Sequence, residues 1–229
     1  MKIAIMQPTY LPWPGYFELM ANSDRFILFD DVQFAKKTWH SRNRIKGTHG
    51  ELMLSVPVKT HGKQFQSLNQ VKIDNAQGWA GKHFKAIDHS YRKAEYYHRY
   101  IGYFEAIYRE PPSSLLDLNT ELLLVIRRIL GIETPMSRSS EIVTRDGMNE
   151  KIIDLCKHYS ADTLYDAKGA ADILDLPKYK EENITLEFQE YEPPLYSQLH
   201  GDFIPYLSVI DLLFNCGSES LNIIKMGRK

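Results

Sequence analysis

The pattern of hydrophobic and polar positions at the start of the chain predicts a strand, a helix and a second strand. Residues 2–6 (KIAIM) form a short apolar run, and Pro14 followed by Gly15 is a favourable start for a helix. Residues 25–34 (RFILFDDVQF) are almost continuously apolar before and after two aspartates, which is typical of a buried parallel strand that delivers carboxylates at its end. A strand, a helix and a strand within about thirty residues predict a βαβ unit whose two strands, 2–6 and 25–29, are parallel neighbours.

The rest of the chain alternates between helical and strand-like patterns. Residues 42–58 predict a β-hairpin with its turn at GTHG, and residues 77–130 predict a helical insertion. Further on, the patterns predict a helix around 152–159, a strand at 163–166, a helix from 169, a strand at 184–191 and a helix over 208–217. We therefore expect one α/β domain over residues 1–229, with a Rossmann-like, mostly parallel sheet, a β-hairpin and a helical insertion at about 77–130.

Composition narrows the class of partner. The 229 residues carry 28 basic and 29 acidic side chains, so the net charge of -1 gives no general attraction for nucleic acid or an anionic membrane. The apolar runs are far too short for a membrane span, and the first residues lack the arrangement of a signal peptide. Cys156 and Cys216 have no CxxC spacing and lie in apolar helical patterns, which favours buried free thiols over a disulfide or a nucleophile. We expect a cytoplasmic protein.

The first candidate site is the loop between the first strand and the first helix, residues 7–16 (QPTYLPWPGY). In open α/β sheets this turn is the usual anion-binding position. Its three prolines stiffen the loop, and Gly15 allows a ligand to approach the backbone. The side chains that can hydrogen-bond to or stack on a base or sugar are Gln7, Tyr10, Trp13 and Tyr16. The alternative is that this loop is a structural cap on the sheet.

The second candidate site follows the second predicted strand. Asp30 and Asp31 are candidates for a general base, or for holding Mg²⁺ on a nucleotide phosphate. Downstream, Trp39 precedes a compact polar and cationic group made of Arg42, Asn43, Arg44 and Lys46. Alternation along an extended segment places the three cations on one face, where they match the geometry of phosphate. The alternative is a solvated basic face.

A third set of candidates is dispersed along the second half of the chain. Ser139, Ser140 and Glu141 form a short polar run, and Gly169 follows Lys168 at a predicted helix start. Asp211 and Asn215 are polar positions four residues apart on one face of a very apolar helix. Capping and turn formation are the alternative roles, and the sequence favours them slightly.

Several common catalytic motifs do not occur in the sequence. It contains no HExxH, GxSxG, Walker A or GxGxxG pattern, and its eight histidines have no metal-like spacing. No protein-bound metal site is therefore predicted.

The same segments carry a family resemblance. The motifs MQPTYLPWPGYF, FDDVQF, KKTWHSRNRIK, LSVPV, DLCKHYSADT and LSVIDLLFN together resemble the WbqC-like protein family over nearly the whole chain. The resemblance implies a place among bacterial O-antigen and other surface-polysaccharide biosynthesis proteins. It also implies a function proposed for the family, the transfer of glycine or another aminoacyl group onto an amino sugar.

The opening loop also has the frame of the H-x-G-H turn of adenylate-forming nucleotidyltransferases. Trp13, Gly15 and Tyr16 stand in the positions of the first histidine, the glycine and the second histidine. Because both histidines are missing, Arg42, Arg44 or Lys46 would have to bind the phosphate in their place. By this analogy the cofactor would be ATP with Mg²⁺.

We therefore expect an acyl or aminoacyl transferase that acts on a nucleotide-linked amino sugar, with nucleotide-sugar or amino-acid ligands. Two alternatives remain open: a non-catalytic nucleotide-sugar-binding protein, and an interaction protein that forms a homodimer or binds a pathway enzyme. The geometric expectation is that Trp13, Asp31 and Arg44 line one cleft, because each follows the end of a predicted strand.

Overall fold

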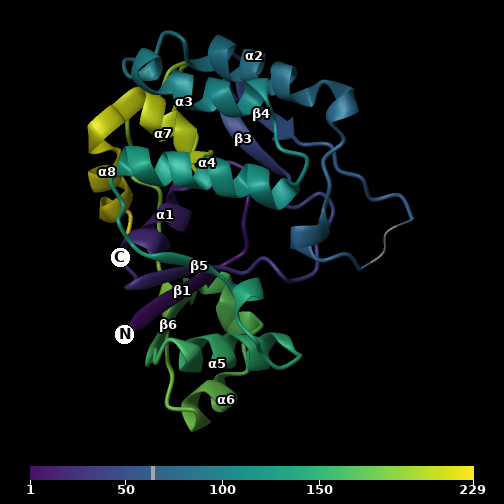
Figure 1. Cartoon of the computed structure of the whole chain (residues 1–229). Coiled ribbons are helices and arrows are strands. Elements are labelled where there is room, and N and C mark those ends of the chain that lie inside the picture. Colours follow the sequence, from purple (N-terminus) through teal and green to yellow (C-terminus); the bar gives the residue numbers. More distant parts are fainter. Residues whose placement is uncertain (63–64) are drawn as a thin grey trace.

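Five parallel strands form the central sheet of the computed structural model, which describes residues 1–62 and 65–229 (Figure 1). The strands are β1 (Lys2–Met6), β2 (Arg25–Leu28), β5 (Met136–Arg138), β6 (Thr163–Ala167) and β7 (Thr185–Gln189), in the order β5-β2-β1-β6-β7. The chain thus moves outward from β1 to β2 and β5, and then returns to the other side of β1 for β6 and β7. The strand order reverses between β1 and β6, which is where open α/β sheets bind ligands.

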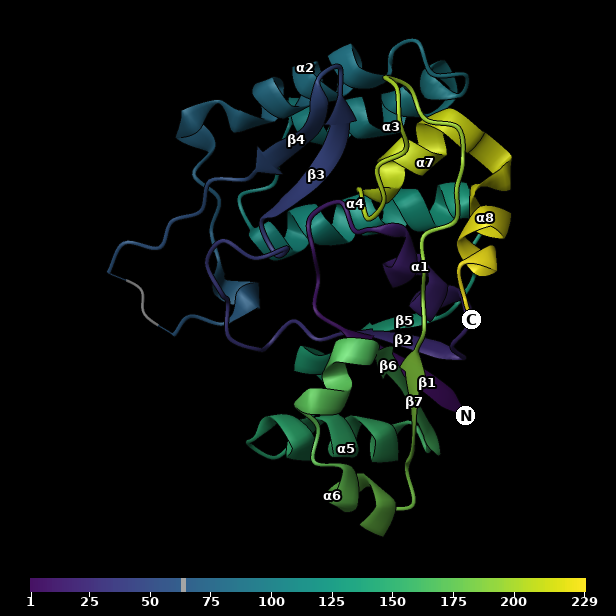
Figure 2. The same cartoon turned by 180° about the vertical axis from the view of Figure 1, so that it is seen from behind.

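The sheet is buried on both faces, and alternate residues of its central strands point to opposite sides. Ile3 and Ile5 pack in one apolar cluster with α5 (Met148–His158) and α6 (Leu176–Glu181). Ala4, between them, packs in a second cluster with helices that include α1 (Pro14–Ala21). Figures 1 and 2 show α5 and α6 on one side of the sheet and α1 on the other. This period of two explains why the strands read as continuous apolar runs.

The second layer lies beyond α1 and consists of helices around a β-hairpin (Figure 2). Its elements are β3 (Arg42–Gly47), β4 (Gly50–Ser55), α2 (Trp79–Tyr91), α3 (Tyr97–Arg109), α4 (Leu115–Leu130), α7 (Val209–Cys216) and α8 (Ser220–Met226). The 3₁₀ turns are η1 (Leu68–Gln70), η2 (Asn75–Gln77), η3 (Ser139–Glu141), η4 (Lys168–Asp172) and η5 (Gly217–Glu219). Strand β3 contacts both α2 and α7, so the helices hold the hairpin against the opening loop of the sheet.

The structure confirms the main predictions of fold. The strands β1 and β2 are parallel neighbours, with Ile3 opposite Arg25, and the hairpin turns between Gly47 and Gly50. Helix α4 begins after Ser114, whose side chain accepts a hydrogen bond from the Asp117 N–H, and ends at Gly131 in the left-handed conformation. The sheet is more regular than expected, because all five of its strands are parallel.

Four local predictions were wrong or incomplete. The strand β5 was not predicted, since three residues are too short to show a pattern. The polar stretch before Pro111 is two helices, α2 and α3, and the segment from Gly169 is a 3₁₀ turn instead of an α-helix. Helix α8 was missed because Gly217, with φ of 55°, ends α7 as expected, but the chain then resumes a helix.

Two further sequence-based expectations concern cysteines and membranes. Cys156 is a buried free thiol and Cys216 a half-buried one, and burial raises their pKa values to about 12 and about 11. Within residues 1–62 and 65–229, none of the helices has both the length and the apolar character that a membrane crossing requires.

Candidate functional site

A cavity of about 690 Å³ opens at the carboxyl ends of β1, β2 and β6. Met6 and Gln7 line it at the end of β1, Phe29 at the end of β2, and Asp166 and Ala167 at the end of β6. The cavity therefore lies where the strand order reverses, and its volume falls within the range of about 300–1,000 Å³ that is usual for small-molecule sites.

One wall of the cavity combines aromatic rings with a cation. It includes Trp13 from the opening loop, Trp39 from the loop before the hairpin, and Arg44 from β3. The Arg44 guanidinium lies 5.5 Å from the centroid of the Trp39 ring and forms an ion pair with Glu51 at 2.8 Å. Its second terminal nitrogen donates to the carbonyl oxygen of Tyr206 at 3.3 Å. These contacts hold the guanidinium in place at the cavity wall.

Trp13 and Gly15 depend on each other. A Cβ added to Gly15 would lie 2.2 Å from Cη2 of the Trp13 indole, so the ring occupies the space that the glycine leaves. The indole also packs edge-on against Tyr191, with ring centroids 5.2 Å apart, and against Tyr206 at 5.7 Å. Gly15 is at the start of α1 as expected, but its small size serves the indole that lines the cavity.

Gln7, Tyr16 and His40 form a hydrogen-bonded group at the cavity. The Tyr16 hydroxyl donates to the carbonyl oxygen of Gln7 at 3.3 Å, and Nε2 of His40 lies 2.6 Å from Gln7 Oε1. Burial lowers the pKa of His40 to about 4, so this imidazole is neutral at pH 7. Among the described residues Nδ1 of His40 has no hydrogen-bond partner. His40 was not predicted, although it lies within the TWHSRNR segment that drew attention to this region.

Asp166 is the acidic side chain that the sequence reasoning missed. It ends β6 and lines the cavity, and its Oδ1 accepts a hydrogen bond from the Ala167 N–H at 2.7 Å. Burial raises the pKa of this carboxyl group to about 7, although the hydrogen bond from Ala167 opposes the shift. A signal was present in the sequence, because Asp166 ends a predicted strand just as Asp30 and Asp31 do. A carboxyl group that titrates near neutral pH in a cavity is a candidate for proton transfer.

Asp30, in contrast, is buried and does not line the cavity. Its carboxylate accepts hydrogen bonds from the Ser139 hydroxyl at 3.1 Å, the Ser140 N–H at 3.0 Å and the Ser140 hydroxyl at 2.8 Å. The predicted ligand-binding serines therefore bind Asp30 itself. Glu141 completes the same turn, with its carboxylate 3.4 Å from the backbone nitrogen of Arg138.

Asp31 is held by an ion pair and does not line the cavity. Its carboxylate lies 2.5 Å from Nζ of Lys151 and accepts a hydrogen bond from the Ser139 hydroxyl at 2.5 Å. Partial burial raises its pKa, but the bonds from Lys151 and Ser139 outweigh that effect and lower the pKa below its usual value. Because the donors around both carboxylates are already arranged for them, Asp30 and Asp31 do not fit the proposed Mg²⁺–ATP role. In the described part of the chain, no group of three or more His, Cys, Asp or Glu side chains is placed to hold a metal.

Only one of the three cations on β3 lines the cavity. Lys46 is buried, and its ammonium donates to the carbonyl oxygens of Gly201 at 3.1 Å and Asp202 at 2.6 Å. Arg42 lies 6.0 Å from the Trp39 ring, but it is outside the cavity lining. Of the three cations that were predicted to form one ligand-binding face, Arg44 lines the cavity, and Arg42 and Lys46 do not.

Asn43 lines the cavity and also fixes the opening loop. Its side-chain amide donates to the carbonyl oxygens of Tyr10 at 3.2 Å and Leu11 at 2.6 Å. The backbone N–H of Tyr10 donates to the carbonyl oxygen of Trp39 at 2.9 Å. These bonds attach the loop to the hairpin and bring Trp13 and Arg44 to one cavity.

The remaining predicted residues lie away from the cavity. Tyr10 is fully buried, and its hydroxyl is 2.8 Å from Nδ1 of His83 and 2.5 Å from the Tyr108 hydroxyl, so its ring cannot stack on a ligand in the cavity. Asp211 is also fully buried and accepts a hydrogen bond from the Tyr196 hydroxyl at 2.8 Å. Asn215 donates to the Asp211 carbonyl oxygen at 2.7 Å.

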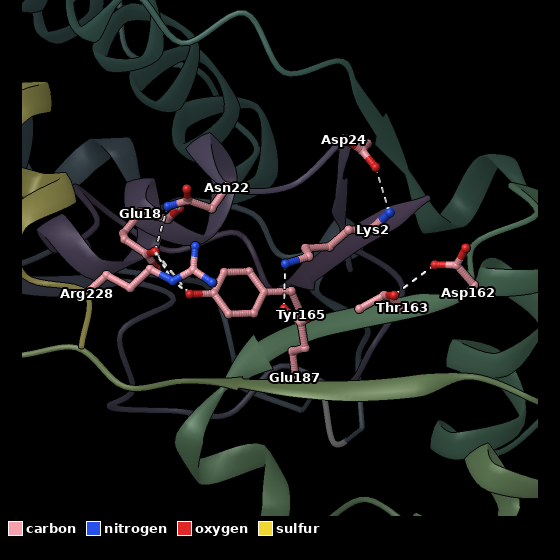
Figure 3. Close-up of polar contacts among 9 residues, drawn as sticks. All are labelled: Lys2, Glu18, Asn22, Asp24, Asp162, Thr163, Tyr165, Glu187 and Arg228. Carbon is pink, nitrogen blue, oxygen red and sulfur yellow. Dashed lines mark hydrogen bonds and ion pairs between the residues drawn. The ribbon is translucent and has the colours of Figure 1, made fainter.

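A polar network centred on the buried carboxylate of Glu18 joins α1 to β6 (Figure 3). The Glu18 carboxylate on α1 accepts hydrogen bonds from the Tyr165 hydroxyl at 3.0 and 2.9 Å and from the Asn22 side chain at 2.6 Å. The guanidinium of Arg228 lies 3.9 Å from the same carboxylate. Because Tyr165 precedes Asp166 in β6, the network attaches to α1 the strand whose end carries Asp166.

Comparison with known proteins agrees with the resemblance read from the motifs. The model of the WbqC-like protein family matches residues 7–223. The chain is 34% identical over 230 residues to the uncharacterized protein Rv1507c of Mycobacterium tuberculosis, a match that covers 100% of this chain and 99% of the relative. No solved structure matches the chain.

Proposed function

The chain belongs to the WbqC-like protein family, and we propose that it is an enzyme that transfers an acyl group to the amine of a nucleotide-linked amino sugar. The observation that carries the proposal is the position of Asp166, a carboxyl group with a pKa of about 7, in a cavity at the point where the strand order reverses. The transfer of a group onto an amine needs a base for the ammonium proton, and this is the lining residue best suited to that role.

The aromatic wall supports the nucleotide part of the proposal. Trp13 and Trp39 offer ring faces on which a base can stack, and Arg44 supplies a guanidinium that matches phosphate oxygens. The ion pair of Arg44 with Glu51 reduces its net charge but also holds it in position. Under this proposal the sugar points into the cavity and the nucleotide lies across Trp13 and Trp39.

The proposed step balances without a metal or a redox partner. The Asp166 carboxylate takes one proton from the sugar ammonium, which frees the nitrogen lone pair. The nitrogen attacks the carbonyl carbon of an activated acyl donor, a thioester or another acyl derivative with a good leaving group. The C–N bond of the amide forms, and the bond to the leaving group breaks. The leaving group departs with the electron pair and accepts the second proton of the nitrogen.

The surroundings of Asp30 and Asp31 argue against an adenylation step inside this protein. Asp30 and Asp31, the carboxylates that would hold Mg²⁺, are bound by Ser139, Ser140 and Lys151. We therefore propose that the acyl donor is already activated when it binds to this protein. No step is assigned to ATP.

Binding without turnover is the second candidate function. It is supported by the same lining, because Trp13, Trp39 and Arg44 offer stacking and phosphate contacts that do not depend on proton transfer by Asp166. The two candidates differ in what happens to the bound sugar.

The experiment is a two-part assay of binding and product. Calorimetry with nucleotide-linked amino sugars tests binding, and mass spectrometry of mixtures with acyl thioesters tests the formation of an amide. We expect micromolar binding and an amide product, both in the wild type and in Asp172→Asn, an exposed carboxylate outside the cavity lining. We expect Asp166→Asn to bind the sugar but to form little product. Binding without product in the wild type would favour the second candidate, and the absence of binding would contradict both.

A further inference from the structure

The cavity has a second wall that the proposed nucleotide and sugar do not use. This wall is formed mainly by the apolar side chains Ile5, Phe29, Ile152, Ala170 and Leu174, and Asp166 lies on the same face of the sheet, two residues after Leu164. Most of these residues belong to the apolar cluster between the sheet and α5. The aromatic and cationic wall, in contrast, comes from the opening loop and β3, on the other side of the sheet. The cavity therefore joins a polar surface and an apolar surface that different layers of the fold supply.

The apolar wall continues to the molecular surface. Met148, at the start of α5, and Ile173, after η4, both line the cavity and are 41% and 62% exposed. These two side chains extend the apolar lining from the cavity to the surface, whereas single exposed apolar side chains elsewhere need no explanation.

This lining does not suit a glycyl group. A glycyl donor is short and carries its own ammonium group, which would have to leave water beside aliphatic side chains. The carboxylate that could pair with it, Asp166, is already needed as the base for the acceptor amine. Aliphatic carbon, in contrast, gains free energy from each methylene that this wall removes from water.

We infer that the acyl group transferred by this protein is an aliphatic chain of several carbons, which the apolar wall formed by Ile5, Phe29, Ile152, Ala170 and Leu174 holds. The inference rests on the proposed function and names its donor. This aliphatic group differs from the glycyl group that the resemblance implies. It is inferred from the lining of the cavity instead.

The test measures chain length without requiring turnover. The probes are N-methyl alkanamides of four, six and eight carbons, which are neutral and carry the acyl half of the proposed amide product. Glycine N-methylamide is the comparator. We expect affinity, measured by calorimetry, to rise about fourfold for each added methylene, which corresponds to about 0.8 kcal/mol per buried methylene. A flat series, or tighter binding of glycine N-methylamide than of the octanamide, would overturn the inference.

A glycine in the lining offers a variant that adds a side chain at the cavity with little risk to folding. Gly169 lines the cavity, and a Cβ added there would meet no atom within 4 Å. We expect Gly169→Leu to weaken the octanamide at least tenfold and to leave the butanamide within about twofold. Gly102→Leu is the matched control, since its Cβ also meets no atom within 4 Å and the residue lies on α3, away from the cavity. Equal effects of the two variants on the octanamide would show that the chain does not bind at this wall.

The outcomes separate this inference from the proposed function. If amide product forms only with a glycyl donor, the function stands and the aliphatic donor is wrong. If no donor gives product but the alkanamides bind with the expected dependence on length, the transferase proposal fails and the apolar compartment stands as a binding site.

Discussion

Two strand ends of the same sheet carry aspartates, yet their surroundings give them opposite properties. At the end of β2, Asp30 and Asp31 are bound by Ser139, Ser140 and Lys151, and the pKa of Asp31 is lowered. At the end of β6, the carboxylate of Asp166 accepts a hydrogen bond from the Ala167 N–H and lines the cavity, and burial raises its pKa to about 7. The position at a strand end brings each carboxylate to the same edge of the sheet. The donors around it decide whether it is a structural anchor or a group able to exchange protons.

The largest expected effect is on turnover, and it concerns the end of β6, where Asp166 faces the cavity. Asp166→Asn should lower kcat at least about 100-fold, the lower bound for loss of a general base. In the wild type, kcat should rise with pH through about 7 as the carboxyl group loses its proton, and this limb should be missing from the variant. Steady-state kinetics across pH 5–9 (about the range that spans this transition) would check it. An unchanged pH profile in the variant would remove Asp166 from the mechanism.

Substitutions at the end of β2, where Asp30 and Asp31 are bound by other side chains, should mainly change stability. Asp30→Ala leaves the backbone N–H and the hydroxyl of Ser140 without their acceptor, so the free energy of unfolding should fall by about 3 kcal/mol. Ser140→Ala removes a single hydroxyl donor and should cost about half as much. Urea denaturation measures both. If Asp30→Ala instead kept its stability and lost turnover, the assignment of roles to the two strand ends would have to be reversed.

Substitution of Trp13 tests whether the aromatic wall of the cavity binds a ligand. Trp13→Ala should weaken nucleotide-sugar binding by about 1–3 kcal/mol, the scale of one stacked base, as measured by calorimetry. Stability should fall as well, because the indole packs against Tyr191 and Tyr206. Gly15→Ala sharpens the experiment, since its new Cβ displaces the ring without removing it. If both variants are destabilised but bind with wild-type affinity, the opening loop is a structural cap.

The two strand ends should also differ in the sign of their pH dependence of stability. The lowered pKa of Asp31 means that its contribution is present above its usual pKa and is lost as the pH falls through the lowered value. Since Asp31 is partly exposed, that contribution is about 1 kcal/mol or less. The raised pKa of Asp166 acts in the opposite direction, because the folded state keeps a proton that the unfolded state releases. Stability from this group therefore falls as the pH rises from about 4 to about 7.

Urea denaturation between pH 3 and 8 (about the span of both transitions) separates the two groups. The difference between wild type and Asp31→Asn should shrink toward low pH, and the difference between wild type and Asp166→Asn should favour the variant increasingly up to about pH 7. Parallel curves for the two variants would contradict the contrast between the strand ends.

The sequence by itself determined most of the local elements and pointed to the edge of the sheet at which the cavity opens. Apolar runs defined β1 and β2, and prolines with Gly15 marked the loop and the start of α1, because these signals act within a few residues. The aromatic and cationic composition of the loop and of β3 singled out Trp13 and Arg44, and both residues line the cavity.

Only the tertiary structure decided which of these side chains share the cavity. Asp30 and Asp166 each end an apolar run, so the chain near them looks alike, but the serines that bind Asp30 are more than 100 residues away in sequence. Arg44 and Lys46 are two residues apart on β3, so the sequence pattern places them on one face. In the structure, however, the ammonium of Lys46 binds carbonyl oxygens of residues 201 and 202. Partners brought together by folding set burial, charge and pKa, and these contacts between distant residues leave no mark in the local pattern of the sequence.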